Sequence, residues 1–154
     1  MARPDSENIL IVGTGTVGRS LWEAYSTIFP NAQFSVWNRS AEGAEQFAID
    51  CEGVAVATDL EVAVKAADIV TSATMTTDPI LKGSWFRAGQ HIDLIGAYRP
   101  DMREADDEAL LRSRVFVDSY ATTIGHIGEL KIPLEAGVIT DDHIVADYYE
   151  LDKF

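Results

Sequence analysis

Residues 8–21, NILIVGTGTVGRSL, decide the fold. An apolar run ends in Gly-x-Gly-x-x-Gly and a helical pattern follows, which is the arrangement of a dinucleotide-binding turn. Gly13 would form the tight turn, Gly15 would let the backbone approach a pyrophosphate, and Gly18 would let the helix pack closely on the strand. The amino end of that helix offers N–H groups and a positive dipole end to the pyrophosphate. Glycine-rich turns also occur for steric reasons alone, so the context of the motif decides.

Apolar runs and helical patterns alternate along the rest of the chain. Strands are expected at residues 8–12, 33–37, 54–57, 68–74, 91–95 and 115–117. Helices are expected at residues 19–29, 41–51, 58–67 and 101–113, with a short helical piece at 81–86, a further helix at 121–130 and a loop at 133–137. This alternation predicts a Rossmann-type α/β fold, in which a doubly wound parallel sheet of about six strands has the order 3-2-1-4-5-6.

Length and composition indicate one dinucleotide-binding domain over residues 1–154. No apolar run reaches the roughly 18 residues of a membrane helix, and the amino terminus has no signal-peptide pattern. The net charge of -13 disfavours nucleic acid and acidic membranes as partners, and an anionic cofactor would need local N–H groups and arginines. The single cysteine, Cys51, excludes an internal disulfide and is expected to be buried; a cytoplasmic location is the simplest setting.

The end of the second expected strand indicates which dinucleotide is bound. An Asp or Glu at this place usually holds the ribose 2′-hydroxyl of NAD, but here the sequence is Asn38-Arg39-Ser40, without a carboxylate. Arg39 could pair with a 2′-phosphate, and Ser40 adds a hydroxyl and a helix amino end. These residues favour NADP(H), with NAD(H) as the alternative. The competing interpretation is a solvated arginine beside a helix-capping serine.

Two further segments are candidates for the nicotinamide end of the cofactor. Ala73, Thr74 and Met75 follow the fourth expected strand, and Gly96 and Ala97 follow the fifth. Ligands bind beyond the carboxyl ends of the strands in this fold, where small residues can admit a ring. For Ala73, Thr74 and Met75, a polar loop that binds no ligand is nearly as good an interpretation.

The remaining chemically active residues give weaker signals. The three histidines, His91, His126 and His143, lie in separate segments without metal-ligand spacing, so no metal site is expected. His126 could be catalytic, but a plain loop histidine is the simpler interpretation. The acidic residues within 101–108 are expected to face solvent. The sequence assigns no catalytic residue.

Four segments in order resemble the ornithine cyclodeaminase/mu-crystallin family. They are GTGTVG at residues 13–18, VWNRS at 36–40, ADIVTSAT at 67–74 and IDLIGAYRPDMREADD at 92–107. The resemblance implies that Gly13, Thr14, Gly15, Thr16, Val17 and Gly18 hold the pyrophosphate, that Asn38, Arg39 and Ser40 meet the 2′-phosphate, and that Thr74, Met75, Gly96 and Ala97 approach the nicotinamide. It extends from residue 2 to about residue 151.

The chain departs from the family pattern at three places. Family members usually have Gln-Ala where this chain has Val17-Gly18. Cyclodeaminases have a catalytic Asp at the position of Tyr98, and a phenol of pKa about 10 cannot replace a carboxylate at neutral pH. The family's substrate-binding and dimerising part precedes the nucleotide domain. Its absence here implies a fragment, an excised domain or a truncated gene product of a larger two-part protein.

The resemblance therefore implies the NADP(H)-binding domain of an oxidoreductase, either a ketimine or imine reductase or an amino acid dehydrogenase. Its partner in the intact protein would be a small amino or imino acid. One alternative is an ornithine cyclodeaminase that uses bound NAD. Another is a non-catalytic nucleotide-binding or interaction module, which the missing substrate part favours for this chain alone.

Overall fold

The computed structural model describes residues 2–153. Met1 and Phe154, the outermost residues of the expected domain, lie outside the described residues. The chain divides into two compact units. The first unit contains the residues up to Thr74 together with Trp85–Ile95, and the second contains Met75–Ser84 and the residues from Gly96 onward.

The first unit is built on a five-stranded parallel sheet in the order β3-β2-β1-β4-β5. Its strands are β1 Asn8–Val12, β2 Gln33–Trp37, β3 Val54–Val56, β4 Ile69–Ser72 and β5 His91–Leu94. In register, Ile9 lies beside Phe34 on one side and Ile69 on the other. The near-continuous apolar runs of β1 and β4 are fully buried, as parallel strands covered on both faces require. The Rossmann-type α/β fold is thus confirmed.

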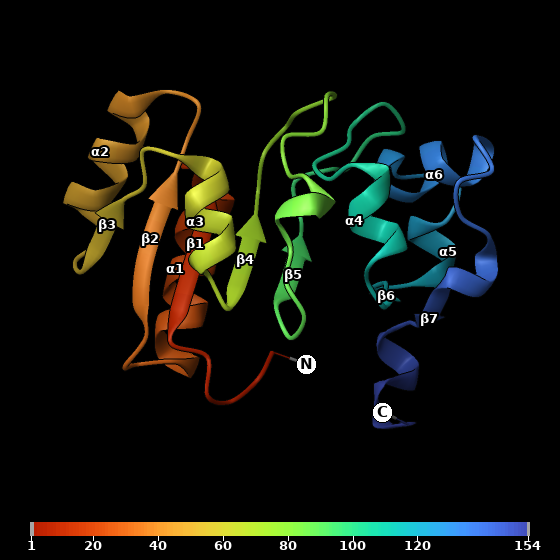
Figure 1. Cartoon of the computed structure of the whole chain (residues 1–154), viewed down its shortest axis with the longest axis horizontal. Coiled ribbons are helices and arrows are strands. Elements are labelled where there is room, and N and C mark those ends of the chain that lie inside the picture. Colours follow the sequence, from red (N-terminus) through yellow and green to blue (C-terminus); the bar gives the residue numbers. More distant parts are fainter. Residues whose placement is uncertain (1, 154) are drawn as a thin grey trace. The chain divides into compact units, whose positions relative to one another are not determined.

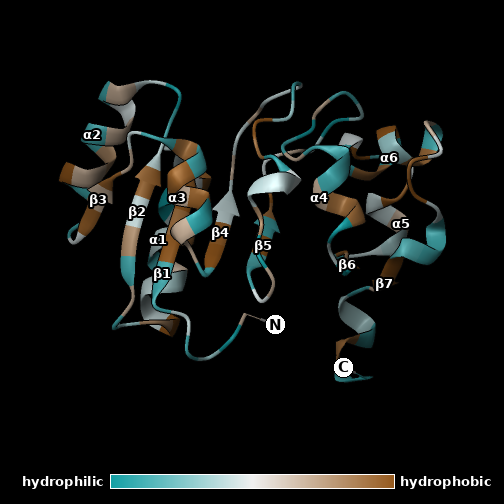
Figure 2. Cartoon of the chain, viewed as in Figure 1, coloured by the Kyte–Doolittle hydropathy of each residue, from teal (hydrophilic) through white to brown (hydrophobic). Residues whose placement is uncertain are grey.

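Three helices cover the sheet: α1 Thr16–Ile28, α2 Ala41–Asp50 and α3 Leu60–Ala66. Side chains alternate between the two faces along a strand, so Ile9 and Ile11 of β1 point to the same face. They share a core cluster with Phe47 of α2, and Trp22 of α1 packs against it. In Figure 1, α3 crosses in front of the sheet and α1 lies behind it, and Figure 2 shows the hydrophobic colouring of the strands between them.

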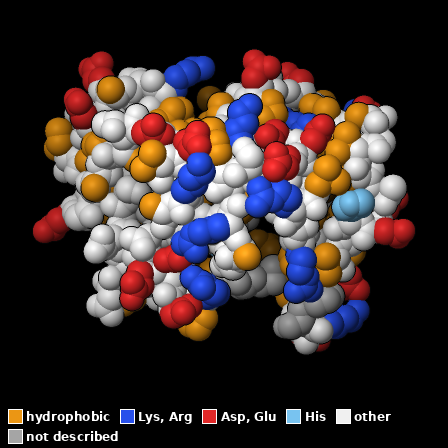
Figure 3. Space-filling model, in the orientation of Figure 1, with side chains coloured by type: hydrophobic (Ala, Val, Ile, Leu, Met, Phe, Trp, Pro, Cys, Tyr) orange, Lys and Arg blue, Asp and Glu red, His pale blue; other side chains and the backbone are white. Residues whose placement is uncertain are grey.

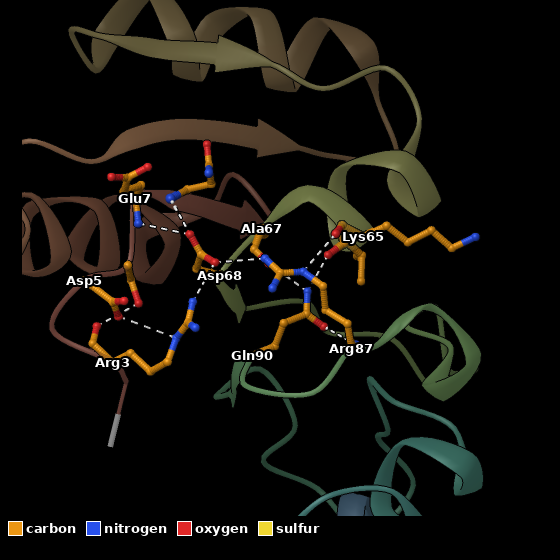
Figure 4. Close-up of polar contacts among 11 residues, drawn as sticks. Arg3, Asp5, Glu7, Lys65, Ala67, Asp68, Arg87 and Gln90 are labelled. Atoms are coloured by element: carbon orange, nitrogen blue, oxygen red, sulfur yellow. Dashed lines mark hydrogen bonds and ion pairs between the residues drawn. The ribbon is translucent and has the colours of Figure 1, made fainter.

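Asp68 anchors the amino-terminal edge of this sheet. Its carboxylate accepts hydrogen bonds from Arg3 at 3.0 Å and Arg87 at 2.8 Å, and from the backbone N–H groups of Glu7 and Asn8 at 3.0 and 3.1 Å. Figure 4 shows both guanidinium groups converging on it. The Arg87 bond and the backbone donors hold the pKa of Asp68 at about 2. The segment before β1 is therefore tied to the start of β4.

The second unit contains a small sheet of two parallel strands, β6 Val115–Phe116 and β7 Ile144–Ala146. Residues 115–117 were expected to form the sixth strand of the main sheet, and this prediction was wrong. Among the described residues the main sheet ends at β5, because β6 pairs with β7, a strand that the sequence pattern did not indicate. Val115 and Ile144 belong to a separate core cluster with Leu130.

Two helical predictions in the second unit also need correction. The helix expected at 101–113 is only α4 Asp107–Leu111, because Asp106 is its N-cap and its carboxylate accepts the N–H of Ala109 at 3.0 Å. The helix expected at 121–130 is two helices, α5 Tyr120–Thr123 and α6 Gly128–Glu135, separated at Gly125, which has φ +77°. Pro133 lies inside α6 rather than in a loop.

Short 3-10 segments complete the structure: η1 Gly83–Trp85, η2 Asp141–His143 and η3 Tyr148–Lys153. Within residues 2–153, no helix has the length and apolar character needed to cross a membrane. Figure 3 shows acidic side chains spread over the visible face with Lys and Arg among them.

Candidate dinucleotide-binding site

The glycine loop begins where β1 ends. Gly13 has φ +104°, a conformation that side chains rarely adopt, and its N–H donates to the carbonyl of Trp37 at 2.9 Å. A Cβ at Gly13 would lie 2.7 Å from the carbonyl oxygen of Ala73 and 3.3 Å from the methyl group of Thr74. The loop therefore turns tightly against the end of β4, and only glycine fits there.

Gly18 and Gly15 have opposite surroundings. A Cβ at Gly18 would lie 2.4 Å from the carbonyl oxygen of Gly13, so this buried glycine is needed for the helix to approach the loop. At Gly15 a Cβ would meet no atom of the described chain within 4 Å beyond its two chain neighbours, and its φ of -73° is available to any residue. The packing of the chain itself thus gives no reason for a glycine at position 15.

The amino end of α1 is suited to an anion. Gly15 is the N-cap of α1, so no side chain caps the first turn, and that turn contains no acidic residue. The N–H groups of a first helical turn have no partner within the helix. Thr16 and Val17 are exposed beside them, and Thr14 is half-buried. A 13-residue helix also places the positive end of its dipole here.

The end of β2 lies in the same unit and carries Asn38, Arg39 and Ser40. Ser40 is the N-cap of α2, as expected, and its hydroxyl accepts the N–H of Gly43 at 3.2 Å. The Asn38 amide donates to the Ser40 carbonyl at 3.2 Å. Arg39 is exposed and makes neither an ion pair nor a side-chain hydrogen bond with any residue between 2 and 153. Its guanidinium is available to an anion.

Gly43, in the first turn of α2, is a residue that the sequence analysis missed. A Cβ there would lie 2.7 Å from the amide nitrogen of Asn38 and 3.2 Å from the hydroxyl oxygen of Thr14. The structure therefore brings the glycine loop and the end of β2 together at Gly43. A glycine within a helix, where its propensity is poor, was the available signal.

The expected nicotinamide residues divide between the two units. Ala73 and Thr74 lie against Gly13 in the first unit, and the Ala73 N–H donates to the carbonyl of Val12 at 2.8 Å. Met75, Gly96 and Ala97 belong to the second unit. Met75 is exposed, whereas Gly96 and Ala97 are half-buried.

Buried carboxylates in the second unit contradict one expectation. The acidic residues within 101–108 were expected to face solvent, but Glu104 is fully buried. Its Oε2 accepts the N–H of Gly96 at 2.7 Å, which offsets the loss of hydration. Glu129, at the start of α6, is also buried and accepts two backbone N–H groups. Because Glu104 lies in a polar stretch, residues 103–108, no apolar period marked it as buried.

The other reactive side chains are not assembled into a catalytic group. Cys51 is buried as expected, and burial raises the pKa of its thiol. His91 is half-buried, and burial lowers its pKa. His126 is exposed. Within residues 2–153 no group of His, Cys, Asp and Glu has the arrangement of a metal site.

The sheet order and the glycine turn between β1 and α1 define a Rossmann-type α/β protein. The model of the ornithine cyclodeaminase/mu-crystallin family matches residues 1–151, and the chain belongs to this family.

Three relatives show where in the family the similarity lies. The chain is 47% identical to Delta(1)-pyrroline-2-carboxylate reductase of Paracoccus denitrificans over 98% of the chain and 49% of that protein. It is 38% identical to ketimine reductase mu-crystallin of Rattus norvegicus over 82% of the chain and 41% of that protein. The structure of Thermococcus litoralis Delta(1)-pyrroline-2-carboxylate reductase in complex with NADH and L-proline matches with a TM-score of 0.92 and 30% identity, over 98% of this chain and 48% of that one. The chain thus spans about half the length of these relatives.

Proposed function

We propose that the first unit binds a nicotinamide dinucleotide at the amino end of α1, with Gly13 to Gly18 around the pyrophosphate. The observation that carries the proposal is Gly15, where a Cβ would meet open space although Gly13 and Gly18 are both required by packing. Close approach of a ligand to the backbone explains the glycine at position 15. The uncapped first turn of α1 supplies N–H donors for that ligand. The NADH in the Thermococcus litoralis relative supports the class of ligand.

We propose that this dinucleotide is NADP(H). Arg39 lacks an anionic partner among the described residues and lies two residues beyond the end of β2, the place at which the adenosine ribose lies in this fold. Asn38 presents no negative charge that would repel a 2′-phosphate. The relative from Thermococcus litoralis holds NADH, so the preference for NADP(H) rests on this chain's own Arg39 and not on that structure.

The reaction we propose for the longer protein is reduction of a cyclic imine, or of the imine of a 2-keto acid. Similarity to the reductase of Paracoccus denitrificans over nearly the whole chain supports this class. The bound cofactor supplies a hydride. The residues of the first unit would hold and orient the cofactor, with Ala73 and Thr74 toward its nicotinamide end. We propose that residues 1–154 correspond to the nucleotide-binding part of the two-part family members.

Replacing Arg39 tests the choice of cofactor. Arg39→Ala should weaken NADPH binding by on the order of 1.5–3 kcal/mol, because one charge-assisted contact to the 2′-phosphate is lost, and should leave NADH binding almost unchanged. Fluorescence titration of both cofactors on wild type and variant measures this. Arg114→Ala, a change at an exposed arginine of the second unit, is the matched control. A wild type that prefers NADH, or an equal loss for both cofactors, would contradict the role given to Arg39.

A chimaera tests the reaction. We would replace the matching half of the Paracoccus denitrificans reductase with this chain and measure NADPH oxidation with Delta(1)-pyrroline-2-carboxylate. Turnover of this cyclic imine is expected. Conversion of L-ornithine instead would favour cyclodeamination. Tyr98 argues against that reaction, because it has an exposed phenol in place of a carboxylate. A folded chimaera that binds NADPH without turnover would favour a non-catalytic module.

A further inference from the structure

Gly43 lies in the first turn of α2, yet neither the capping of this helix nor its backbone geometry requires a glycine there. The Gly43 N–H donates to the Ser40 hydroxyl at 3.2 Å, a bond that any residue except proline could make. Its φ is not positive, unlike that of Gly13. Glycine is also a poor helix former compared with alanine. The reason for a glycine at this position therefore lies in the side chains around its Cα.

The Asn38 side chain lies against the Cα of Gly43. A Cβ at Gly43 would be 2.7 Å from the amide nitrogen of Asn38 and 3.6 Å from its carboxamide carbon. The same nitrogen donates to the Ser40 carbonyl at 3.2 Å. An alanine at position 43 would push the amide out of this place. Because the displaced atom is the end of a flexible side chain, the change would alter the direction of the amide more than the stability of the unit.

The bond to Ser40 determines which way the Asn38 amide faces. A carbonyl oxygen only accepts hydrogen bonds, so the amide nitrogen faces Ser40 and the amide oxygen faces away from it. Asn38 is half-buried and comes directly after β2, and no group within residues 2–153 donates to its amide oxygen. In this fold the adenosine ribose lies at the end of the second strand, where an acidic side chain usually accepts from a ribose hydroxyl. The Asn38 amide oxygen is an uncharged acceptor at that place.

We propose that Gly43 is a positioning residue: its bare Cα leaves Asn38 the orientation in which the amide oxygen accepts a hydrogen bond from the adenosine 3′-hydroxyl of the cofactor. The inference rests on the proposed function, which places the adenosine ribose at the end of β2. It divides the recognition of that ribose between two neighbours. Arg39 would bind the 2′-phosphate, which only NADP(H) has, whereas Asn38 would hold a hydroxyl that NAD(H) and NADP(H) share.

The variant Gly43→Ala tests this division when both cofactors are titrated by fluorescence. It should weaken NADPH and NADH equally, by about fivefold, the scale of one neutral hydrogen bond. Arg39→Ala, in contrast, should weaken NADPH alone.

A second pair of ligands reports the hydroxyl itself. By calorimetry, the wild type should bind adenosine 2′,5′-bisphosphate about fivefold more tightly than its 3′-deoxy analogue, and Gly43→Ala should bind the two equally. A general defect in α2 would weaken both ligands and keep the preference. A wild type without this preference, or a Gly43→Ala variant that retains it, would overturn the proposal.

A double variant identifies the side chain through which Gly43 acts. In the background of Asn38→Ala, adding Gly43→Ala should change NADPH affinity by less than about twofold. A further loss of about fivefold would overturn the proposal. It would point instead to Thr14, whose hydroxyl oxygen would lie 3.2 Å from the added Cβ.

Matched controls exclude a folding defect. Ile49→Ala, at an exposed position of the same helix, should change the affinity for none of these ligands. Without ligand, Gly43→Ala should unfold at a temperature no lower than the wild type, because alanine is the better helix former. A wild type that binds none of the four ligands would refute the proposed function instead.

Discussion

Gly15 and Gly18 are separated by less than one turn of α1, yet an added methyl group would affect stability differently at the two positions. A methyl group at Gly18 would meet the Gly13 carbonyl oxygen at 2.4 Å, whereas one at Gly15 would enter open space. We expect Gly18→Ala to lower the free energy of unfolding by about 3 kcal/mol through overpacking. Gly15→Ala should cost about 1 kcal/mol or less, through the poorer N-cap. Urea denaturation of the two variants measures the difference, and equal costs would contradict the packing described for Gly18.

The sequence predicted the glycines but not every residue around them. The spacing of Gly13, Gly15 and Gly18 is a local signal, because each glycine acts on its own turn or on its neighbours along the chain. Gly43 lies against Thr14 of the glycine loop, and the Glu104 carboxylate accepts the Gly96 N–H across an irregular loop. Contacts of that kind leave no period in the sequence, so no local pattern indicated them.

At the scale of elements, Asp68 joins the segment before β1 to the start of β4. Its pKa of about 2 lies below its ordinary value of 3.8, so its stabilising contribution is complete above about pH 4 and is lost as the pH falls through 2. Asp68→Asn should lower the free energy of unfolding at neutral pH by about 2–3 kcal/mol, because bonds to two arginines lose their ionised acceptor. The free energy of unfolding of the variant should also fall less steeply in acid than that of the wild type.

Urea titrations at several pH values between about 2 and 7 measure both effects of Asp68→Asn. Asp59→Asn is the matched control, since this exposed carboxylate caps α3 through the single N–H of Val62 and lies outside the Asp68 network. If Asp68→Asn changed neither the stability at neutral pH nor its decline in acid, the anchoring role of Asp68 would be wrong.

The errors in element prediction have separate local causes. Residues 101–113 have an acidic, helix-compatible composition, but Asp106 caps the helix and so starts it late. The preceding residues, Met102 to Ala105, are buried and form no helix. β1 and β4 were predicted well because burial on both faces accompanies their apolar runs, and β2 because its apolar residues alternate. β6 and β7 are only two and three residues long, too short for a periodic signal.

At the scale of the whole molecule, the two units should lose stability at opposite ends of the pH range. Burial raises the pKa of Glu129 in the second unit to about 7 from 4.5, against the opposing effect of its backbone donors. Folding therefore favours the protonated form of Glu129. The contribution of this group to the free energy of unfolding is complete below about pH 4.5 and is lost as the pH rises through 7. The second unit should lose up to about 3 kcal/mol across this range, whereas Asp68 stabilises the first unit throughout it.

Hydrogen exchange resolves this difference between the units. Protection factors of amides in β6 and β7 should fall between about pH 5 and pH 8, while those in β1 and β4 should stay level. Glu129→Gln should remove most of the decline. A parallel decline in both units would contradict the assignment of the titration to Glu129.

A titration of NADPH on the wild-type chain and on Gly15→Ala shows whether the glycine loop holds a dinucleotide. We predict saturable binding by the wild type, weakened at least about tenfold in the variant by a methyl group that the folded chain itself tolerates. Thermal unfolding of both proteins without ligand shows that the loss does not come from instability. Absence of NADPH binding by the wild type, or equal affinity of the two proteins, would contradict the claim that the glycine loop holds a dinucleotide.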